Sequence, residues 1–328
     1  METKATVYIE EEGGTRYPLS ESTVKGTYTS AALTLNTARN YRLHILTSNG
    51  KDYASNYTQA KNTPPIDNVN WRVQNAGLNI FVNSHDDTNS TQYYRWEYEE
   101  TWEILPIYRP VYEYVNRNIR DIVVPYPVVC WGNQRSSQVQ ISRTTALNRD
   151  VVADFRIQSL PANSERLRSR YSILVQQHAL SQEEYQYWEL LRKNTENIGT
   201  LFDPLPAQLT GNIRCLNDEQ ELALGYIGVH SLEQKRIFIS RQELPANINV
   251  LTGYESCVPV DTVFLYPRGI IPPPSPAEIL QAAFGGSNYL PIDKYLSPEL
   301  KLLGYTAKSR DCIDCRTRGT SVKPSFWP

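Results

Sequence analysis

The chain has 328 residues, which is enough for two domains of ordinary size. Its formal net charge is −2, with 33 basic and 35 acidic residues spread along the chain, so no field attracts nucleic acid or an anionic membrane surface. No apolar run approaches the roughly 18 residues that a membrane-spanning helix needs. The 22 tyrosines and 6 tryptophans, against a single methionine, favour strands over packed helices, and the chain is predicted to be mainly β.

The first part of the chain, residues 1–63, is predicted to be a small β domain. Apolar and polar residues alternate over Ala5–Glu11 and Tyr41–Thr47, and the pair Asn49-Gly50 follows the second run. Asn-Gly beside alternating runs is a strong hairpin signal, because both residues tolerate positive φ. The first strand begins almost at residue 1 with nothing before it to pair, so this domain is expected to be truncated at its start.

A larger β-sandwich-like region is predicted over residues 64–266, after the polar, proline-marked segment Ala60–Pro65. Its clearest strand is Tyr93–Ile104, in which the even positions are mostly aromatic and the odd positions mostly charged. A period of two gives a strand one face of each kind. Further strands are expected at residues 71–73, 78–82, 138–142, 171–175, 225–229 and 236–240.

One helix is predicted to be inserted in this region, near residues 181–198, where the apolar period changes from 2 to about 3.6. Ser181 as N-cap and Glu184 three residues later form a capping box. Leu180 can pack on Tyr185 as a hydrophobic staple. These signals together predict where the helix begins.

The rest of the chain is expected to be mostly irregular. Gly199 is predicted to end the helix, and the run Leu201–Pro206 is predicted to be extended. Residues 267–328 are predicted to form a proline-rich segment and a loop-rich tail that contains cysteines. In this segment Pro272–Pro274 impose a stiff extended backbone ahead of a short helix, Pro276–Phe284.

The chain has five cysteines, namely Cys130, Cys215, Cys257, Cys312 and Cys315. The last two have a spacing that suits a redox pair, half of a zinc site or a structural disulfide. A redox pair needs a thiolate at a helix N-terminus beside a βαβ unit, and zinc needs two further ligands at matching spacing, whereas the four histidines are scattered. A disulfide that holds the tail is therefore favoured, with its partners left open.

A polar loop that contains His85, Asp86 and Asp87 is a candidate binding site. Its oxygen and imidazole groups could hold a calcium ion. Calcium takes roughly six to eight oxygens in a shaped site, and this run matches no complete loop signature. A solvated turn is therefore favoured.

The strand Tyr93–Ile104 supplies the other binding candidates, Trp96, Glu100 and Trp102. An exposed aromatic face could stack on a sugar or fit a partner protein, although core packing is the commoner reason for such a stripe. Glu100 interrupts this face, and a carboxyl desolvated beside aromatic rings could act as a general acid. A bulge, or a buried pair with an arginine, is favoured over that role.

Several strings together resemble the family catalogued as domain of unknown function 4249. The first are Tyr94–Trp102, Cys130-Trp131 and Arg170–Val175. The others follow in order: Tyr185–Trp188, Phe202–Pro204, Gly211–Ile213, Gly225-Tyr226, Lys235–Phe238, Cys312–Arg316 and Lys323–Trp327. So many ordered strings are much more specific than any one of them.

The resemblance implies an outer-membrane lipoprotein of Bacteroidota, often encoded beside a TonB-dependent transporter, with an immunoglobulin-like N-terminal region and no established activity. It brings no catalytic residues. Family members usually begin with a lipoprotein signal, an acylated cysteine and further strands, and this chain lacks them. The expected fold is therefore two immunoglobulin-like or β-sandwich-like domains, and membrane attachment is expected only through a lipid anchor absent from this chain.

The expected function is that of a non-catalytic accessory lipoprotein, at the cell surface rather than the periplasmic face, that associates with the transporter and helps to capture or retain its substrate. The bound molecule could be a small molecule, a peptide or a glycan, and no cofactor, metal or nucleic acid is expected. The alternatives are a structural or adhesive surface module and a surface glycan hydrolase. No Gly-x-Ser-x-Gly, Gly-rich phosphate loop or His-Glu-x-x-His motif occurs in the sequence.

Overall fold

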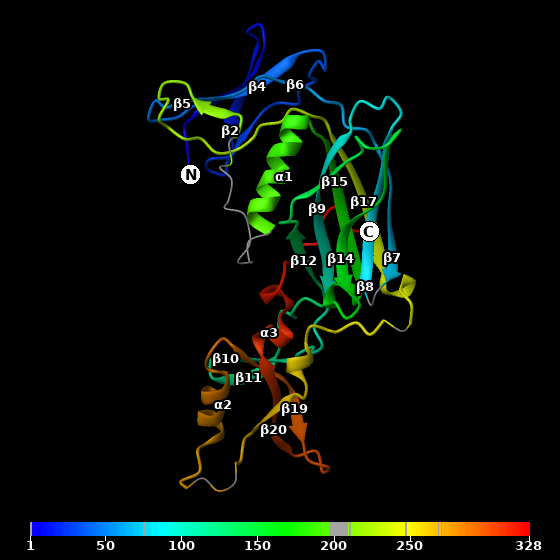
Figure 1. Cartoon of the computed structure of the whole chain (residues 1–328). Coiled ribbons are helices and arrows are strands. Elements are labelled where there is room, and N and C mark those ends of the chain that lie inside the picture. The colour runs from blue at the N-terminus through cyan, green and yellow to red at the C-terminus, as the bar shows by residue number, and fades with distance from the viewer. Residues whose placement is uncertain are drawn as a thin grey trace, which may run out of the picture.

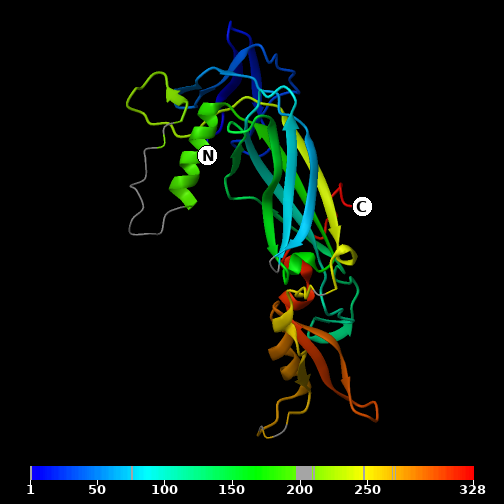
Figure 2. The ribbon, with the colours of Figure 1, turned by 45° about the vertical axis from the view of Figure 1, so that its right-hand side comes forward.

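The computed structural model describes residues 2–74, 77–196, 209, 211–246, 248–267, 269 and 271–328. They form three parts arranged end to end, as Figure 1 and Figure 2 show: an N-terminal sheet, a central sandwich and a smaller C-terminal part. The fold is mainly β, as predicted. No helix in the described residues is long and apolar enough to cross a membrane.

The N-terminal sheet contains the predicted hairpin. Its strands β4 (Asn40–Leu46) and β5 (Asp52–Ser55) pair antiparallel, and Gly50 between them has φ +84°, which glycine adopts without steric cost. Strand β1 (Thr6–Glu11) lies between β2 and β4, so both of its edges are paired. The order is β16-β5-β4-β1-β2-β3, with β6 also on β4. The remaining strands are β2 (Arg16–Glu21), β3 (Tyr28–Thr29), β6 (Thr58–Gln59) and β16 (Ile213–Cys215).

One strand of this sheet comes from a distant part of the chain. Strand β16 pairs with β5, and Lys51 Nζ lies 2.6 Å from the carboxylate of Asp218 just beyond it. Where the chain returns to the sandwich, His230 pairs with Lys61 in an isolated parallel β-bridge. The division of the chain at residues 63 and 266 stays a prediction, and the N-terminal sheet combines residues from both sides of residue 63.

The central sandwich consists of two antiparallel sheets whose facing sides make the main core. One sheet has the order β12-β9-β15-β17, with β13 also on β9, and the other has the order β14-β8-β7. Their bounds are β7 (Ile66–Gln74), β8 (Gly77–Asp86), β9 (Tyr93–Ile104), β12 (Cys130–Arg135), β13 (Gln140–Arg143), β14 (Asp150–Pro161), β15 (Arg170–Ala179) and β17 (Leu232–Ser240). Strand β9 has the predicted bounds, and its even positions Tyr94, Trp96 and Tyr98 are buried in the core.

The inserted helix α1 (Gln182–Glu196) packs beside β9 and β13. Ser181 Oγ accepts a hydrogen bond from the Glu184 N–H at 3.1 Å, as an N-cap does. Leu180 and Tyr185 are buried in one cluster, as the predicted staple requires. The Glu184 carboxylate accepts a hydrogen bond from the Trp188 indole at 3.3 Å rather than closing the capping box.

The strand predicted at residues 225–229 is wrong, because this stretch belongs to no strand. The side chain of Asn212 accepts a hydrogen bond from the Ile227 N–H at 2.8 Å and donates one to its carbonyl at 2.9 Å. The Asn212 side chain therefore makes the two backbone hydrogen bonds that a neighbouring strand would otherwise make with Ile227. The predicted helix end at Gly199 and the run Leu201–Pro206 lie outside the described residues.

The C-terminal part is more regular than the predicted loop-rich tail. A sheet of order β18-β20-β19 and the hairpin β10-β11 pack with α2 around a small core that includes Phe284 and Tyr305. The helix α2 (Pro276–Phe284) has the predicted bounds. The strand pattern of residues 289–309 was missed because Pro291 and Gly304 interrupt it. The other elements are β10 (Tyr112–Val115), β11 (Asn118–Asp121), β18 (Asp261–Phe264), β19 (Tyr289–Leu296), β20 (Leu302–Ser309) and α3 (Arg310–Ile313).

Two disulfides fasten the joint between the sandwich and the C-terminal part, here called the lower joint. Cys130, the first residue of β12, is bonded to Cys315, and Cys257 is bonded to Cys312. The first pair is 185 positions apart in the sequence and the second pair is 55 positions apart. All four cysteines are buried. Long closed loops of this kind restrict the unfolded chain strongly. Cys215 is free and buried in the N-terminal sheet.

Candidate ligand-binding site

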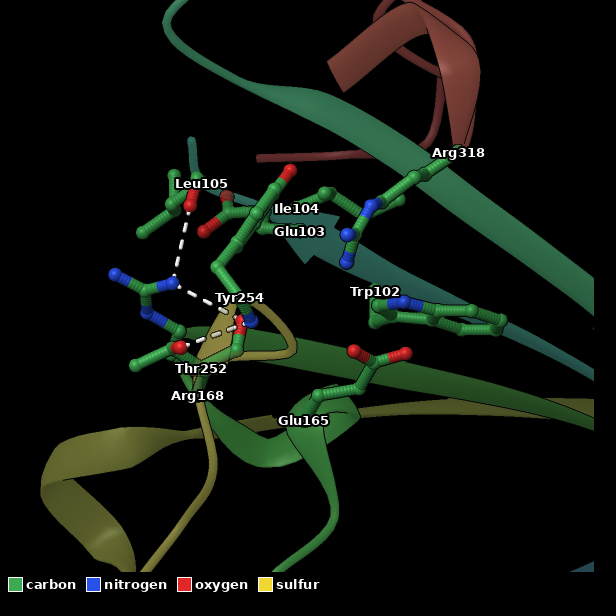
Figure 3. Close-up of a pocket in the computed structure, with 9 residues that line it drawn as sticks. All are labelled: Trp102, Glu103, Ile104, Leu105, Glu165, Arg168, Thr252, Tyr254 and Arg318. Carbon is green, nitrogen blue, oxygen red and sulfur yellow. Dashed lines mark hydrogen bonds between the residues drawn. The ribbon is translucent and has the colours of Figure 1, made fainter. Parts of the chain in front are cut away.

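A pocket of about 130 Å³ lies at the lower joint (Figure 3). It is built from the end of β9, the 3-10 turn η1 (Glu165–Leu167) between β14 and β15, the loop before Cys257, and the residue after the turn η4 (Cys315–Thr317). Its aromatic and charged lining residues are Trp102, Glu103, Glu165, Arg168, Tyr254 and Arg318. Segments far apart in the sequence therefore meet here.

Two arginines fix the walls of the pocket. Arg168 Nη1 donates to the carbonyl oxygens of Leu105 at 3.0 Å and Thr252 at 3.1 Å, and so ties the end of β9 to the opposite loop. The Arg318 guanidinium lies 4.0 Å from the centroid of the Tyr254 ring and donates to a backbone carbonyl of the same loop. These hydrogen bonds and the contact with the Tyr254 ring hold the walls of the pocket in place.

The two carboxylates in the lining differ in their partners. Glu103 accepts hydrogen bonds from the Trp327 indole at 2.9 Å and from the Ser169 hydroxyl. Glu165 is exposed, and no hydrogen bond or ion pair within the described part of the chain engages its carboxylate. Figure 3 shows this carboxylate directed toward the side of the pocket where Arg318 lies. Glu165 is therefore free to bind a ligand.

The two aromatic side chains also have distinct roles. Tyr254 is only 1% exposed, its hydroxyl has no hydrogen-bond partner among the described residues, and burial raises the pKa of this phenol. A buried unpaired hydroxyl costs about 1–3 kcal/mol, and this oxygen has no surface that a ligand in the pocket could reach. A Cβ at Gly132 would lie 2.4 Å from the Trp102 indole, so glycine is required there to seat that ring.

Of the two predicted tryptophans, Trp102 lines this pocket and Trp96 does not. Trp96 is fully buried, donates its indole N–H to Gln177 Oε1 at 2.8 Å, and stacks on Phe155 with a centroid separation of 4.4 Å. Its role is core packing, which the sequence favoured.

Glu100 forms the buried pair with an arginine that the sequence favoured. Its carboxylate is 1% exposed and accepts hydrogen bonds from Arg166 Nη1 at 2.8 Å and from the Tyr171 hydroxyl at 2.6 Å. Burial and this neighbouring carboxylate raise the pKa of Tyr171 well above its usual value, so its hydroxyl remains a donor. With both oxygens bonded inside the sandwich, Glu100 is committed to structure.

The loop of His85, Asp86 and Asp87 borders an open depression of about 270 Å³. The Asp86 carboxylate accepts hydrogen bonds from its own turn, namely from Thr88, Ser90 and Thr91. Burial opposes ionisation of Asp86, but these bonds outweigh it and hold the pKa of the carboxyl well below its usual value. His85 pairs with Asp67 at 2.8 Å, which raises the pKa of His85, and Asp87 is almost fully exposed. The loop is thus satisfied internally, as a solvated turn.

Cys312 and Cys315 belong to two different disulfides and are not bonded to each other. Within the described residues, one group brings three metal-ligating side chains close together, and it consists of Cys257, Asp311 and Cys312. Its two sulfur atoms are bonded to each other, so neither is a thiolate that could hold a metal.

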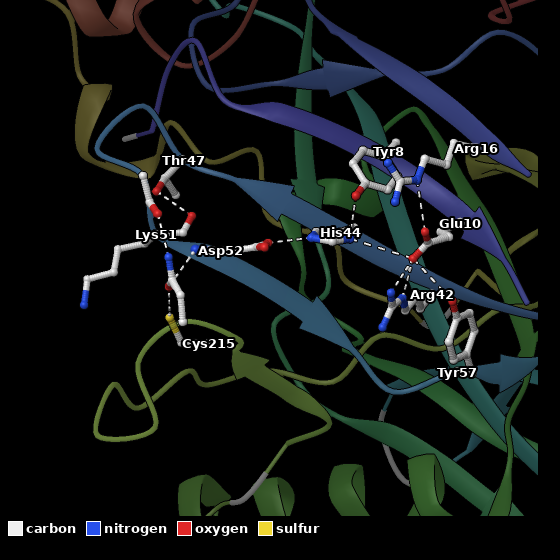
Figure 4. A network of polar contacts seen from close by, with 12 residues as sticks. Tyr8, Glu10, Arg16, Arg42, His44, Thr47, Lys51, Asp52, Tyr57 and Cys215 are labelled. Carbon is white, nitrogen blue, oxygen red and sulfur yellow. Dashed lines mark hydrogen bonds and ion pairs between the residues drawn. The ribbon is translucent and has the colours of Figure 1, made fainter. Parts of the chain in front are cut away.

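A second polar cluster covers one face of the N-terminal sheet (Figure 4). The Tyr8 hydroxyl lies 2.6 Å from His44 Nδ1, and His44 Nε2 lies 2.5 Å from Asp52 Oδ1. This order of hydroxyl, imidazole and carboxylate is the order of a hydrolase triad. Burial raises the pKa of Tyr8, however, so its hydroxyl keeps its proton, whereas an activated nucleophile needs the opposite shift.

The same face contains a buried carboxylate, Glu10, which is 4% exposed. Arg42 and Arg16 donate to it at 2.6 Å and 3.0 Å, and Tyr57 donates at 3.3 Å. Burial raises the pKa of Glu10, and the two arginines more than reverse that shift. Because these side chains come from β1, β2, β4 and the segment after β5, the cluster holds the strands together. Sequence showed the polar positions but not the register that pairs them.

A pair of histidines lies at the joint between the N-terminal sheet and the sandwich, here called the upper joint. His178 Nδ1 and His230 Nδ1 are 3.4 Å apart, and His178 Nε2 lies 3.5 Å from Glu97. Burial and the neighbouring His178 lower the pKa of His230 to about 4. The nearby His178, aided by Arg95, lowers the pKa of Glu97 to about 2. Spacing in the sequence gave no signal for this pair.

Fold and site define a class: a mainly β, disulfide-bonded protein with a sandwich at its centre and a small, polar and aromatic pocket. A family model described as domain of unknown function (DUF4249) matches residues 1–236, and the chain belongs to this family. The resembling strings beyond residue 236 lie outside the match. No curated protein and no solved structure matches the chain.

Proposed function

We propose that the protein is a non-catalytic accessory lipoprotein of the outer membrane in Bacteroidota, exposed at the cell surface and lipid-anchored in its full-length form. It associates with a TonB-dependent transporter and helps to capture or retain the transporter's substrate. Membership of the family supports this proposal, since the resemblance implies that setting.

The observation that carries the proposal is the pair of buried disulfides at the lower joint. Structural disulfides persist in oxidising compartments and are rare in the cytosol of ordinary bacteria. Four of the five cysteines of this chain are used in this way. Such cysteine use favours an extracytoplasmic location.

The pocket supports the substrate-capture part of the proposal. Its walls are fixed by Arg168 and Arg318, and Glu165 offers a free carboxylate to a ligand. A concave site with convergent polar groups on a rigid frame is the usual form of a small-molecule site. The pocket lies between two parts of the molecule, where such sites are common.

The test is an affinity pull-down of the full-length protein from its native outer membrane, followed by mass spectrometry. We expect a TonB-dependent transporter to be recovered near one-to-one, and deletion of the protein to lower substrate uptake. If no transporter is recovered and uptake is unchanged on deletion, the proposal is wrong.

The structural or adhesive module remains the second candidate, and it predicts a loss of adhesion or envelope integrity on deletion rather than a loss of uptake. The glycan-hydrolase alternative rested on Glu100 alone. Because Arg166 and Tyr171 occupy both oxygens of that carboxylate, Glu100 no longer supports it.

A further inference from the structure

We infer that His178 and His230, at the upper joint, bind a divalent transition-metal ion that prefers nitrogen ligands, such as zinc. Their Nδ1 atoms lie 3.4 Å apart, although the residues are 52 positions apart in the sequence. His178 is 8% exposed, and His230 is partly buried. The sequence predicts no metal because its histidines are scattered, and only the fold brings these two together. The inference does not depend on the proposed association with a transporter.

The distance between the two Nδ1 atoms fits a shared metal ion better than a shared proton. A hydrogen bond donated by an N–H group brings donor and acceptor to about 2.7–3.2 Å. Two zinc–nitrogen bonds of about 2.0–2.1 Å that meet at the tetrahedral angle place their nitrogens about 3.4 Å apart. The separation of 3.4 Å between the two rings matches the second arrangement.

The other nitrogen of each ring faces a carboxylate. His178 Nε2 lies 3.5 Å from Glu97 Oε2, and His230 Nε2 lies 3.9 Å from Glu184 Oε1. Histidines that bind a metal almost always direct their second N–H toward a carboxylate, a carbonyl or water, which fixes the ring and strengthens it as a ligand. Both rings of this pair have a carboxylate in that position.

Hydrogen bonding within this row of four side chains leaves one contact without a proton. The row has three contacts, one between the rings and one from each ring to its carboxylate. Two neutral imidazoles carry two N–H groups, so one contact must bring two acceptors together. With both protons on Nε2, each carboxylate has a donor and the two Nδ1 lone pairs are directed at each other. A metal ion between the Nδ1 atoms then satisfies every group in the row.

Neighbouring residues hold the two carboxylates in place. Arg95 Nη1 donates to Glu97 Oε1 at 2.8 Å, which leaves Oε2 for the imidazole. The Trp188 indole donates to Glu184 Oε1 at 3.3 Å. A Cβ at Gly228 would lie 2.1 Å from Glu184 Oε2, so a larger residue there would displace this carboxylate. The outer partners of both rings are thus fixed before any ion binds.

The charges around the pair favour a metal that prefers nitrogen to oxygen. The carboxylates of Glu97 and Glu184 are balanced by the nearby cations Arg95 and Lys61. An ion is therefore held by the imidazole lone pairs rather than by net charge. Zinc, copper and nickel suit imidazole, whereas magnesium and calcium suit oxygen ligands. No third His, Cys, Asp or Glu of the described residues joins the pair at ligating distance, so two positions of a tetrahedral ion remain for water.

The first test is a calorimetric titration of the whole chain with zinc chloride. Both disulfides are kept, metals are removed with EDTA, and the EDTA is then removed by desalting. We expect one zinc ion to bind per chain with a micromolar dissociation constant, and magnesium or calcium not to bind at the same concentrations. Failure of zinc to bind would overturn the inference, and the row would then share a proton instead. Equal binding of magnesium would overturn it as well.

Variants locate the ion. His178→Gln and His230→Gln should each weaken zinc binding at least about tenfold, and Glu97→Gln about tenfold, because metal affinity depends on the ligands and on their outer partners. The matched control is His85→Gln, which changes a more exposed histidine paired with Asp67 and should leave zinc binding unchanged. An equal loss in His85→Gln would place the ion there and refute the inference. If His178→Gln does not fold, the less buried His230→Gln decides, and unchanged zinc binding in it would also refute the inference.

A bound ion would fasten the upper joint. It would link His178 on β15 to His230, whose backbone pairs with Lys61 ahead of the sandwich. A ligand that binds only the folded chain raises its stability by mass action. Zinc should therefore raise the midpoint of thermal unfolding in the parent chain and in His85→Gln but not in His230→Gln. The same rise in His230→Gln would show that zinc binds elsewhere.

Discussion

The two joints of the sandwich are built on different principles. The lower joint is covalent, since both disulfides lie there, and the pocket is walled by side chains from either side of it. The upper joint has no disulfide among the described residues and depends on polar contacts. There Thr63 Oγ1 donates to the Ser231 carbonyl at 2.5 Å and accepts from the Ala179 N–H at 3.1 Å.

This difference indicates that the lower joint is insensitive to pH and that the upper joint responds to it. A disulfide keeps its strength across the ordinary range of pH, whereas hydrogen bonds beside buried histidines depend on protonation. The histidine pair and Glu97 lie at the upper joint. The pocket therefore lies at the joint whose geometry is least sensitive to the surroundings.

The largest effect is expected from opening the lower joint. The double variant Cys130→Ala with Cys315→Ala should lower the free energy of unfolding by about 2–5 kcal/mol, because it releases a long closed loop. Urea unfolding measures this loss. The control is Cys215→Ala at the free cysteine, which should cost less. Equal losses in both variants would show that the cross-link itself contributes little.

The upper joint should weaken in acid. His230 has a pKa of about 4 in the folded protein and ~6.5 in the unfolded chain, so the unfolded chain takes up the proton first. Stability should fall as the pH is lowered from about 6.5 to about 4, by about 3 kcal/mol at most. Glu97, with a folded pKa of about 2, loses its contribution as the pH falls from about 4.5 to about 2, mostly below that window.

Unfolding measured between pH 7 and pH 4 tests this expectation in the parent chain and in His230→Gln. The variant should show a flatter dependence on pH, because the group that titrates is gone. An unchanged slope would mean that other groups carry the acid sensitivity.

A smaller effect is expected from Thr63→Val, which keeps the shape of the side chain and removes both of its hydrogen bonds. The buried N–H of Ala179 then loses its partner, at a cost of about 1–3 kcal/mol. Thr262→Val, on the partly exposed strand β18, is the matched control. Thermal unfolding of the two variants should differ, and equal midpoints would show that Thr63 does not hold the upper joint.

Local signals in the sequence predicted much of the fold. The alternation of Tyr93–Ile104 gave β9 with its bounds, and the run that follows the proline-rich segment gave α2. Each signal lies within a few residues of what it specifies. The strand expected at 225–229 failed because a distant side chain, Asn212, satisfies its backbone.

Less of the site was predictable, because it is assembled from distant segments. Trp102 was named as a candidate on its strand, but nothing in the sequence placed Glu165 and Arg318 beside it. The disulfide partners were equally hidden, since five cysteines allow many pairings and the bonded ones are far apart in sequence. Contacts of this kind depend on the folded topology and not on a local pattern.

The position of the disulfides has a mechanical consequence. Disulfides bridge the lower joint alone among the described residues, so a pull between the first and last parts of the molecule would break the packing of the N-terminal sheet on the sandwich first. The pocket would keep its shape under load while the other end yields.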